Sequence, residues 1–175
     1  MSIPRVIVET ERLILRPFQL EDAEALFVMN SVPEILTYIP TEPFTDVAQA
    51  QKLMVEVIFD DYERRGFGRW AVEHKAHGKV IGFCGPKFIP EYNEVELGYR
   101  YLPEYWRQGI GVEAAKAALG AFPDYGITEA IALILEGNIG SEAVAQKVGM
   151  QRRESNLFMG HRVNVYHKVL SRADK

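Results

Sequence analysis

A short glycine loop in the middle of the chain is the segment best suited to chemistry. It reads Arg107-Gln108-Gly109-Ile110-Gly111-Val112 and stands between the apolar segment EVELGYRYLPEYW and the alanine-rich segment VEAAKAALGA. The start of a helix leaves backbone N–H groups unpaired, and the helix dipole favours negative charge there. Glycine also tolerates unusual backbone angles and has no Cβ to obstruct a phosphate. The loop therefore predicts a seat for a pyrophosphate, the alternative being an ordinary tight turn before a helix.

The loop departs from two familiar nucleotide-binding patterns. No Lys-Ser or Lys-Thr follows the glycines, as a nucleotide-hydrolysing P-loop requires. Only Gly109 and Gly111 are present, without a third glycine in a first βαβ unit, so the dinucleotide fingerprint also fails. A phosphate-bearing cofactor of another kind is expected.

The elements that must position this loop are predicted from hydrophobic period and turn signals. Helices interrupt a mostly antiparallel order of strands, so the predicted fold class is α+β, with one mixed, mostly antiparallel sheet flanked by helices. No linker or internal repeat divides the chain, and a single domain spanning residues 1–175 is expected. Strands are predicted at 11–18, 69–75, 79–89, 92–102, 129–135, 151–155 and 162–170, and helices at 20–30, 45–65, 111–122 and 138–148.

Composition bounds the function classes. The 175 residues are 47% hydrophobic, enough for a sizeable core, and 20 basic against 24 acidic residues give a net charge of −4. Mild acidity argues against direct nucleic-acid binding. Cys84 is the single cysteine, which excludes an internal disulfide and fits a reducing cytoplasm. The sequence shows no signal peptide and no apolar run near the ~18 residues of a membrane span. The four histidines do not have the spacing of metal ligands.

Three segments in this order resemble the GCN5-related N-acetyltransferase (GNAT) superfamily: TERLILRPFQLEDAEAL, GYRYLPEYWRQGIGVEAAKA and EGNIGSEAVAQKVGM. Within it they resemble most closely the branch that acetylates the N-terminal alanine of ribosomal proteins. The resemblance covers about residues 9–170. It implies a twisted sheet that splays open between the fourth and fifth strands, acetyl-CoA bound in that opening, and an amine acceptor. Members often form homodimers, and the same is expected here.

The resemblance implies cofactor contacts in two places before the long central helix. The loop Arg107 to Val112 would cradle the pyrophosphate, although Trp106 stands where many members have Gln or Arg. The end of the fourth strand, Arg100-Tyr101-Leu102, would pair through its backbone with the pantetheine arm. A backbone N–H there would also stabilise the oxyanion formed from the acetyl carbonyl. The plain alternative is a core strand.

Glu96 is the preferred general base. Strand alternation puts Glu94 and Glu96 on one face, opposite Val95, Leu97 and Tyr99. An amine acceptor arrives as ammonium and must lose a proton before its nitrogen attacks, so a carboxylate near the opening could accept it, directly or through a water. Glu94 is the alternative base, and two solvent-facing glutamates without a catalytic role are the third interpretation.

The resemblance implies two further contacts at the start of the next helix. Asn138 would bond the cofactor arm near the thioester, although Asn is also a good plain N-cap. Many members carry a tyrosine on this helix that protonates the departing thiolate, but Ala145 occupies the matching position. Ser141 is then the candidate proton donor, or a hydrogen-bond partner that orients the sulfur.

The sequence thus predicts an acetyl-CoA-dependent N-acetyltransferase that works by direct transfer, with no metal. Direct attack is expected because no convincing protein nucleophile is found; Cys84 lacks an obvious His–Asp partner. The acceptor is a protein N-terminus or a small-molecule amine. A non-catalytic acyl-CoA-binding or regulatory module on the same fold is the rival from another class.

Overall fold

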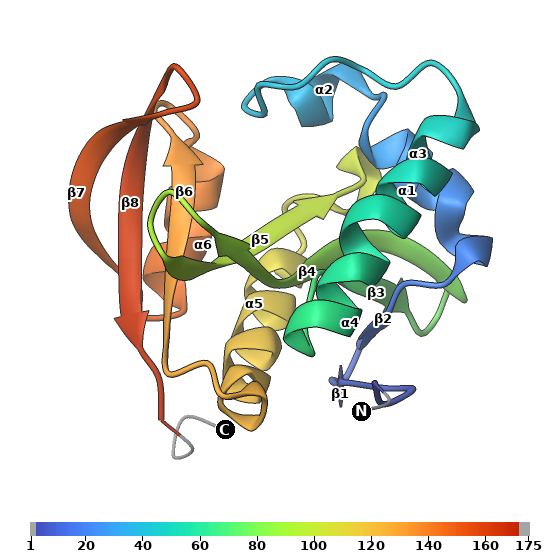
Figure 1. Ribbon diagram of the computed structural model, residues 1–175, viewed down its shortest axis with the longest axis horizontal. Coiled ribbons are helices and arrows are strands. Elements are labelled where there is room, and N and C mark those ends of the chain that lie inside the picture. The colour runs from blue at the N-terminus through green and yellow to red at the C-terminus, as the bar shows by residue number, and fades with distance from the viewer. Residues whose placement is uncertain (1–2, 172–175) are drawn as a thin grey trace.

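One mixed sheet organises the computed structural model, which describes residues 3–171 (Figure 1). Neighbouring strands lie in the order β1-β2-β3-β4-β5-β6-β8-β7. All neighbours are antiparallel except β5 and β6, which are parallel. The strands are β1 (Val8–Glu9), β2 (Leu13–Pro17), β3 (Trp70–His74), β4 (Lys79–Ile89), β5 (Glu94–Tyr101), β6 (Glu129–Leu135), β7 (Gln151–Phe158) and β8 (His161–Val169).

The sheet is opened between β5 and β6. These two strands pair at a single position, Glu96 with Ile131, whereas β5 pairs with β4 along its whole length. A parallel pair needs a crossover connection, and helix α5 (Ile110–Ala121) supplies it. The predicted splay between the fourth and fifth strands is confirmed. These two strands are labelled β5 and β6 because the structure has one additional short strand, β1, before them.

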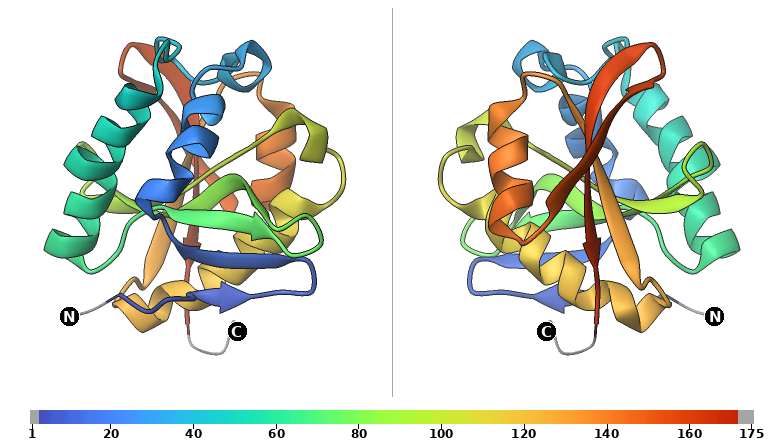
Figure 2. Two further views of the ribbon diagram at one scale, coloured as in Figure 1. Left: turned by 90° about the vertical axis from the view of Figure 1, so that its right-hand side faces the viewer. Right: turned by 90° about the vertical axis from the view of Figure 1, so that its left-hand side faces the viewer.

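Helices cover both faces of the sheet (Figure 2). On one face α1 packs against α3 and β4, and α3 continues into α4. On the other face α5 packs against β4, β5 and α6. No helix in the described part of the chain has the length and apolar run needed to cross a membrane. The remaining bounds are α1 (Ala23–Met29), α2 (Pro33–Leu36), α3 (Val47–Leu53), α4 (Phe59–Arg65) and α6 (Ile139–Lys147).

The main hydrophobic core lies between the sheet and the two helical layers. Its largest fully buried side chains come from strands and helices alike, including Trp70, Phe122, Leu13, Leu26 and Met54. A smaller cluster of Ile131, Val163 and Val165 lies on β6 and β8. The edge strand β7 is exposed along almost all its length. The two clusters lie on opposite faces of β6, because Ala130, Ala132 and Ile134 of the same strand belong to the main core.

The predicted α+β class is confirmed, and the predicted elements are present with shifted ends. The helix predicted at 20–30 begins with a 3-10 turn, Leu20–Asp22, and the helix predicted at 45–65 is continuous but contains a π turn at Met54–Ile58. Asp46 caps it by accepting the Ala48 N–H, and Gly66 ends it with a φ of 77°. Two short elements, β1 and α2, were not predicted because two and four residues carry no period. The ends of the expected 1–175 domain lie outside the described residues.

A buried ion-pair network fixes the start of α1 to the sheet. Arg16 on β2 donates to both carboxylate oxygens of Asp22, at 2.8 and 3.0 Å, and to Glu73 on β3 at 3.0 Å. Asp22 also accepts the Gln19 backbone N–H at 2.8 Å. Since Asp22 is buried, its removal leaves the guanidinium of Arg16 underpaired in the protein interior.

Asp22→Ala is expected to destabilise the fold by about 3 kcal/mol, the usual effect of breaking a buried pair from one side. Urea denaturation followed by far-UV circular dichroism measures this change. Glu24→Ala, an exposed acidic neighbour on the same turn, is the matched control and should change stability by less than about 0.5 kcal/mol. Equal, small effects for both variants would contradict the role given to the network.

Candidate active site

A cavity of about 560 Å³ lies where β5 and β6 diverge. Its walls include Glu96 to Arg100 on β5 and Ala132 to Leu135 on β6. Residues 38–41, after α2, line it on one side, and the tip of the β7–β8 hairpin lines it on the other. Figure 1 shows these two segments facing each other across the opening. A second cavity of about 440 Å³ lies beside Arg16, Asp22 and Glu73, where the charged groups already pair with one another.

Strand β5 presents a different set of groups on each face. Glu96, Gly98 and Arg100 share one face, and Arg100 donates to Asn30 Oδ1 at the end of α1 at 2.8 Å. Tyr99 points to the opposite face, where its hydroxyl donates to the backbone carbonyl of Ser141 on α6 at 2.9 Å. The opening therefore connects two faces of β5. The face toward α1 carries the Glu96 carboxylate, and the face toward α6 carries the Tyr99 hydroxyl beside Ser141.

Glu96 lines the cavity and is largely shielded from water. Burial raises the pKa of its carboxyl to about 7, against the opposing pull of Arg69, a hydrogen bond from the Leu133 N–H, Lys87 and Arg100. The desolvation of a carboxylate outweighs these favourable contacts. A group with a pKa near neutrality can both take and release a proton at physiological pH, as a general base must. The expectation of an exposed glutamate without a role does not fit this environment.

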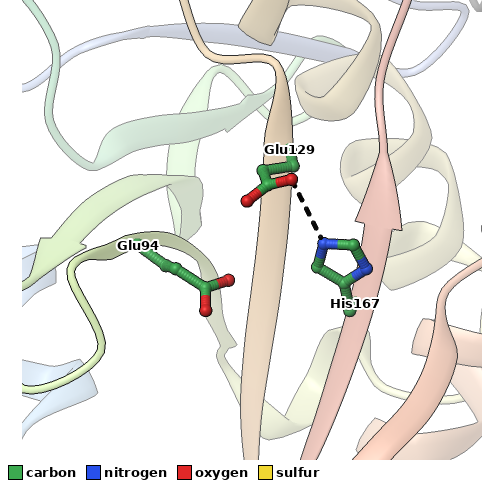
Figure 3. Close-up of side chains that lie close together, drawn as sticks. All are labelled: Glu94, Glu129 and His167. Carbon is green, nitrogen blue, oxygen red and sulfur yellow. Dashed lines mark ion pairs between the residues drawn. The ribbon is translucent and has the colours of Figure 1, made fainter.

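Glu94, the alternative base, is engaged elsewhere. Its two carboxylate oxygens accept from Arg153 on β7 at 2.9 and 3.0 Å, and it does not line the cavity. Its carboxylate points toward Glu129 and His167, which lie 3.6 Å apart (Figure 3). Glu94 and Glu96 share one strand face, as alternation predicts, but they have different surroundings. Glu94 pairs with Arg153, and Glu96 lines the cavity.

The same three side chains are a group that could hold a metal ion. One ligand atom from each of Glu94, Glu129 and His167 lies within 4.8 Å of the others in the described part of the chain. The guanidinium of Arg153 already neutralises Glu94, so a cation would have to displace it. We therefore interpret these side chains as structural contacts between β5, β6, β7 and β8.

The glycine loop forms the start of α5 as expected, and its two glycines do different things. Gly109 is the N-cap with a φ of 77°, a left-handed conformation that favours glycine, and no side chain caps the helix. The first intrahelical bond is donated by Glu113 to the Gly109 carbonyl, so the three N–H groups from Ile110 to Val112 have no acceptor within the helix. This arrangement fits a pyrophosphate.

Gly111, in contrast, has no positive φ and lies beside α6 and β5. A Cβ placed there would lie 3.4 Å from Val144 Cγ2 and 3.6 Å from Tyr101 Cε2, which is ordinary van der Waals contact. Its part in keeping a phosphate path clear stays a prediction.

Two residues that the sequence did not single out hold this loop. Arg12 donates to the Gln108 carbonyl at 2.8 Å and to Glu113 Oε1 at 2.7 Å. Thr10 donates to the other oxygen of Glu113 at 2.6 Å. Burial alone would raise the pKa of Glu113, but the hydrogen bonds from Thr10 and Arg12 prevail and lower it. Contacts separated by a hundred residues leave no local signal in the sequence.

At the end of β5 some backbone groups are already paired within the chain. The Leu102 N–H donates to the Ile81 carbonyl at 2.9 Å, and the Trp106 indole donates to the Tyr101 carbonyl at 2.8 Å. Backbone groups alternate in direction along an antiparallel strand, so those of Arg100 also face β4, while those of Tyr99 and the Tyr101 N–H face away from it. These last groups are best placed for a cofactor arm, and pairing of the arm with the segment Arg100 to Leu102 stays a prediction.

The start of α6 shows one of the two roles considered for Asn138, and its contact with the cofactor arm stays a prediction. Asn138 caps the helix by accepting the Ser141 N–H at 3.2 Å, which leaves its amide donors available. Ser141 Oγ donates to the Tyr99 hydroxyl at 2.9 Å, so a phenol that the sequence analysis did not select stands beside the serine. Ala145, at the position of the missing tyrosine, is fully buried. Tyr99 brings a phenol to this site from the strand instead of the helix.

Comparison with known proteins agrees with this geometry. The acetyltransferase (GNAT) domain model matches residues 12–151. The chain belongs to the GNAT acetyltransferase family. It is accordingly an acetyl-CoA-dependent N-acetyltransferase, and the resemblance read from the sequence is confirmed.

Individual relatives support the same assignment. The chain is 31% identical to an uncharacterized N-acetyltransferase, YoaA, of Bacillus subtilis, over 83% of each chain. An acetyltransferase structure from Agrobacterium tumefaciens aligns with a TM-score of 0.79 and 25% identity, covering 96% of this chain and 95% of that one. A ribosomal-protein-S5-alanine acetyltransferase from Vibrio fischeri aligns with a TM-score of 0.77 at 18% identity, over 93% and 96% of the chains, which shows a shared fold.

Glu96→Gln is expected to raise thermal stability at alkaline pH. Because the pKa of Glu96 is raised, the folded state binds a proton that the unfolded state has lost, and this group's contribution to stability falls as pH rises toward about 7. Melting temperatures from pH 5 to 9 should differ little at pH 5, and by a few degrees in favour of the variant above pH 8. A variant that melts lower than the wild type at pH 8 would contradict the desolvated environment.

Proposed function

We propose that this enzyme transfers the acetyl group directly to a primary amine, with Glu96 as general base. The observation that carries the proposal is a largely buried carboxylate with a pKa of about 7 in the wall of the cavity between β5 and β6. Direct attack is favoured because Cys84 is fully buried and its burial raises the pKa of the thiol to about 12. Such a thiol is not a nucleophile at neutral pH.

The cofactor contacts follow from the same geometry. The N–H groups at the start of α5 and the loop Arg107 to Val112 would hold the pyrophosphate, and the backbone groups of Tyr99 with the Tyr101 N–H would hold the pantetheine arm. Asn138 has amide donors free for the same arm. Bound acetyl-CoA supplies an acetyl thioester, which is activated toward amines.

The chain's own groups then handle the protons. The acceptor ammonium gives one proton to Glu96, and the freed nitrogen forms a bond to the carbonyl carbon as the carbon–sulfur bond breaks. A backbone N–H of β5 stabilises the charge that develops on the carbonyl oxygen. The nitrogen gives its second proton to water, and the departing thiolate gains one from water through the Ser141 and Tyr99 hydroxyls. The products are an amide and the free thiol.

The acceptor is a protein N-terminal α-amine or a small-molecule amine. The fold shared with a ribosomal-protein-S5-alanine acetyltransferase supports the first class as a proposal. We also propose one domain that works in the cytoplasm, as the single free cysteine suggests, and forms homodimers, as the family resemblance suggests.

Gly109→Glu is expected to abolish binding of acetyl-CoA in a calorimetric titration, because it places bulk and a carboxylate at the proposed pyrophosphate seat. Gly126→Glu is the matched control: it has the same φ of 77°, and a Cβ there has no neighbour within 4 Å. The control therefore carries the same backbone strain and the same charge away from the loop. Equal binding by both variants would overturn the proposed seat, and a folded wild type that binds no acetyl-CoA would overturn the function.

Glu96→Gln is expected to lower kcat by about 10²–10⁴-fold while leaving acetyl-CoA affinity unchanged, as removal of a general base does. The wild-type rate should rise with pH through an apparent pKa of about 7, and the variant should lose that step. Initial rates of thiol release from pH 5.5 to 9 measure both effects. Undiminished turnover would exclude Glu96 as the base, and absence of turnover by the wild type with every amine would favour the non-catalytic acyl-CoA-binding module.

A further inference from the structure

An arginine beside the proposed base forms no ion pair. Arg69, which precedes β3, is half-buried and lines the cavity, and its Nε is buried without a hydrogen bond. Its guanidinium forms no ion pair or hydrogen bond with residues 3–171, and its carbon lies 5.3 Å from the centre of the Phe83 ring. Glu96 and Asp61 act on this charge only from beyond ion-pair distance. A partly desolvated cation without a direct partner is unfavourable, and arginine cannot relieve this by giving up its proton. We therefore look for the function of Arg69 in a group that binds beside it.

A second guanidinium meets the same ring. Arg100 lies 5.3 Å from the centre of Phe83 and also lines the cavity. Its Nη1 donates to neutral oxygens, Asn30 Oδ1 at 2.8 Å and the Met29 carbonyl at 3.3 Å, and its Nε is buried without a partner. No carboxylate lies within ion-pair distance of either arginine in the described part of the chain. Two cations thus border one cavity without an anion between them.

Gly98 on β5 forms part of the cavity wall. It stands opposite Gly85 on β4, between the pair Phe83–Arg100 and the pair Lys87–Glu96, and the backbone of Arg69 and Trp70 fills the space above Gly85. A Cβ on Gly98 would lie 3.4 Å from Glu96 Oε1 and 3.9 Å from Phe83 Cε2. The missing side chain of Gly98 therefore leaves a gap between the base and the ring of Phe83 with its two guanidiniums.

The other charged residues nearby do not form ion pairs with Arg69 or Arg100. Lys87 is paired with Asp61 at 2.8 Å, so it neither adds an unpaired cation nor leaves Asp61 free for Arg69. Glu96 is the remaining acid in the cavity wall, and burial keeps it protonated for part of the neutral range. The unmatched charge of the acceptor side is therefore positive.

We propose that the acceptor is an amino acid, whose carboxylate binds between Arg69 and Arg100 while its ammonium faces Glu96. This inference rests on the proposed function and names its substrate class. Guanidinium groups recognise carboxylates through paired hydrogen bonds, and the anion removes the repulsion between the two arginines. The two charges of the amino acid therefore match the two ends of the gap, the carboxylate at the arginines and the ammonium at Glu96. A polyamine or an aminoglycoside would bring further positive charge to the two arginines, so the structure disfavours polycationic acceptors.

The test compares amino acids with their carboxamides, which keep the amine and side chain but lack the negative charge. The panel contains the proteinogenic amino acids, the matching carboxamides, short peptides blocked at the C-terminus, phosphoethanolamine and spermidine. Thiol release from acetyl-CoA gives kcat/KM for each. At least one amino acid should be preferred over its carboxamide by about tenfold or more, the effect of one charged hydrogen bond.

Arg69→Gln separates recognition from structure. The acid-to-carboxamide preference should collapse toward one through a rise in KM for the amino acid. Because the variant removes a half-buried charge that has no ion pair, its melting temperature should be equal to or higher than that of the wild type. Arg64→Gln, an exposed arginine of α4 with the same change in charge, is the control and should keep the preference.

Each outcome decides the proposal. Carboxamides, blocked peptides or spermidine accepted as well as amino acids would overturn it and leave the acetyltransferase function intact. A preference for phosphoethanolamine would overturn the carboxylate in favour of a phosphate. If no amine is acetylated, melting temperatures with CoA and each panel compound decide, and no selective gain from the amino acids would overturn the inference. An Arg69→Gln variant that keeps the preference would also overturn it.

Discussion

The sheet is joined across its middle by one residue pair, Glu96 with Ile131, and the rest of the site depends on that constraint. A continuous ladder would have buried β5 against β6 and used all of their backbone groups. The divergence instead leaves a cavity walled by two strands, with Glu96 to Arg100 of β5 in its wall. Glu96 lies at the single point where β5 still pairs with β6, and residues from both faces of β5 line the cavity beyond it.

The low polarity of this space explains why its charged groups behave unusually. Glu96 loses more hydration than its basic neighbours restore, so its pKa rises to about 7. Arg69 and Arg100 lose hydration as well, and burial lowers the pKa of both. A protein selected for stability alone would pair these groups with one another or replace them with apolar residues. Their survival as unmatched charges indicates that the free energy is recovered when a ligand of complementary charge enters, as is common at functional sites.

The sequence predicted what is carried by local pattern. The loop with Gly109, the strand before it and the order of the elements were recognisable, because backbone conformation and hydrophobic period leave marks on neighbouring residues. The alternation that put Glu94 and Glu96 on one face was also correct, but it could not say that Arg153 would bind one and the cavity receive the other. Strand identity alone does not determine which partner a side chain meets.

The missed residues have partners far away in the sequence. The contact between Tyr99 and Ser141 joins a strand to a helix more than forty positions later. Arg69 is of interest because its Nε has no hydrogen-bond partner. An unpaired charge has no sequence signature at all. The nearness of Gly111 to Val144 was likewise hidden, since the sequence does not show which element a glycine will face.

The N-terminal strands contribute more than an edge to the sheet. A carboxylate in the first turn of α5, as at Glu113, would repel the anion that the helix start should attract. Arg12 neutralises it, and the same guanidinium binds the Gln108 carbonyl and so holds a loop in which Arg107 has a φ of 59°. A Cβ at Gly109 would lie 3.5 Å from Arg12 Nη2, a nitrogen with no hydrogen-bond acceptor among residues 3–171. The turn between β1 and β2 therefore keeps the loop preorganised and leaves one donor beside the glycine where the phosphate charge is expected.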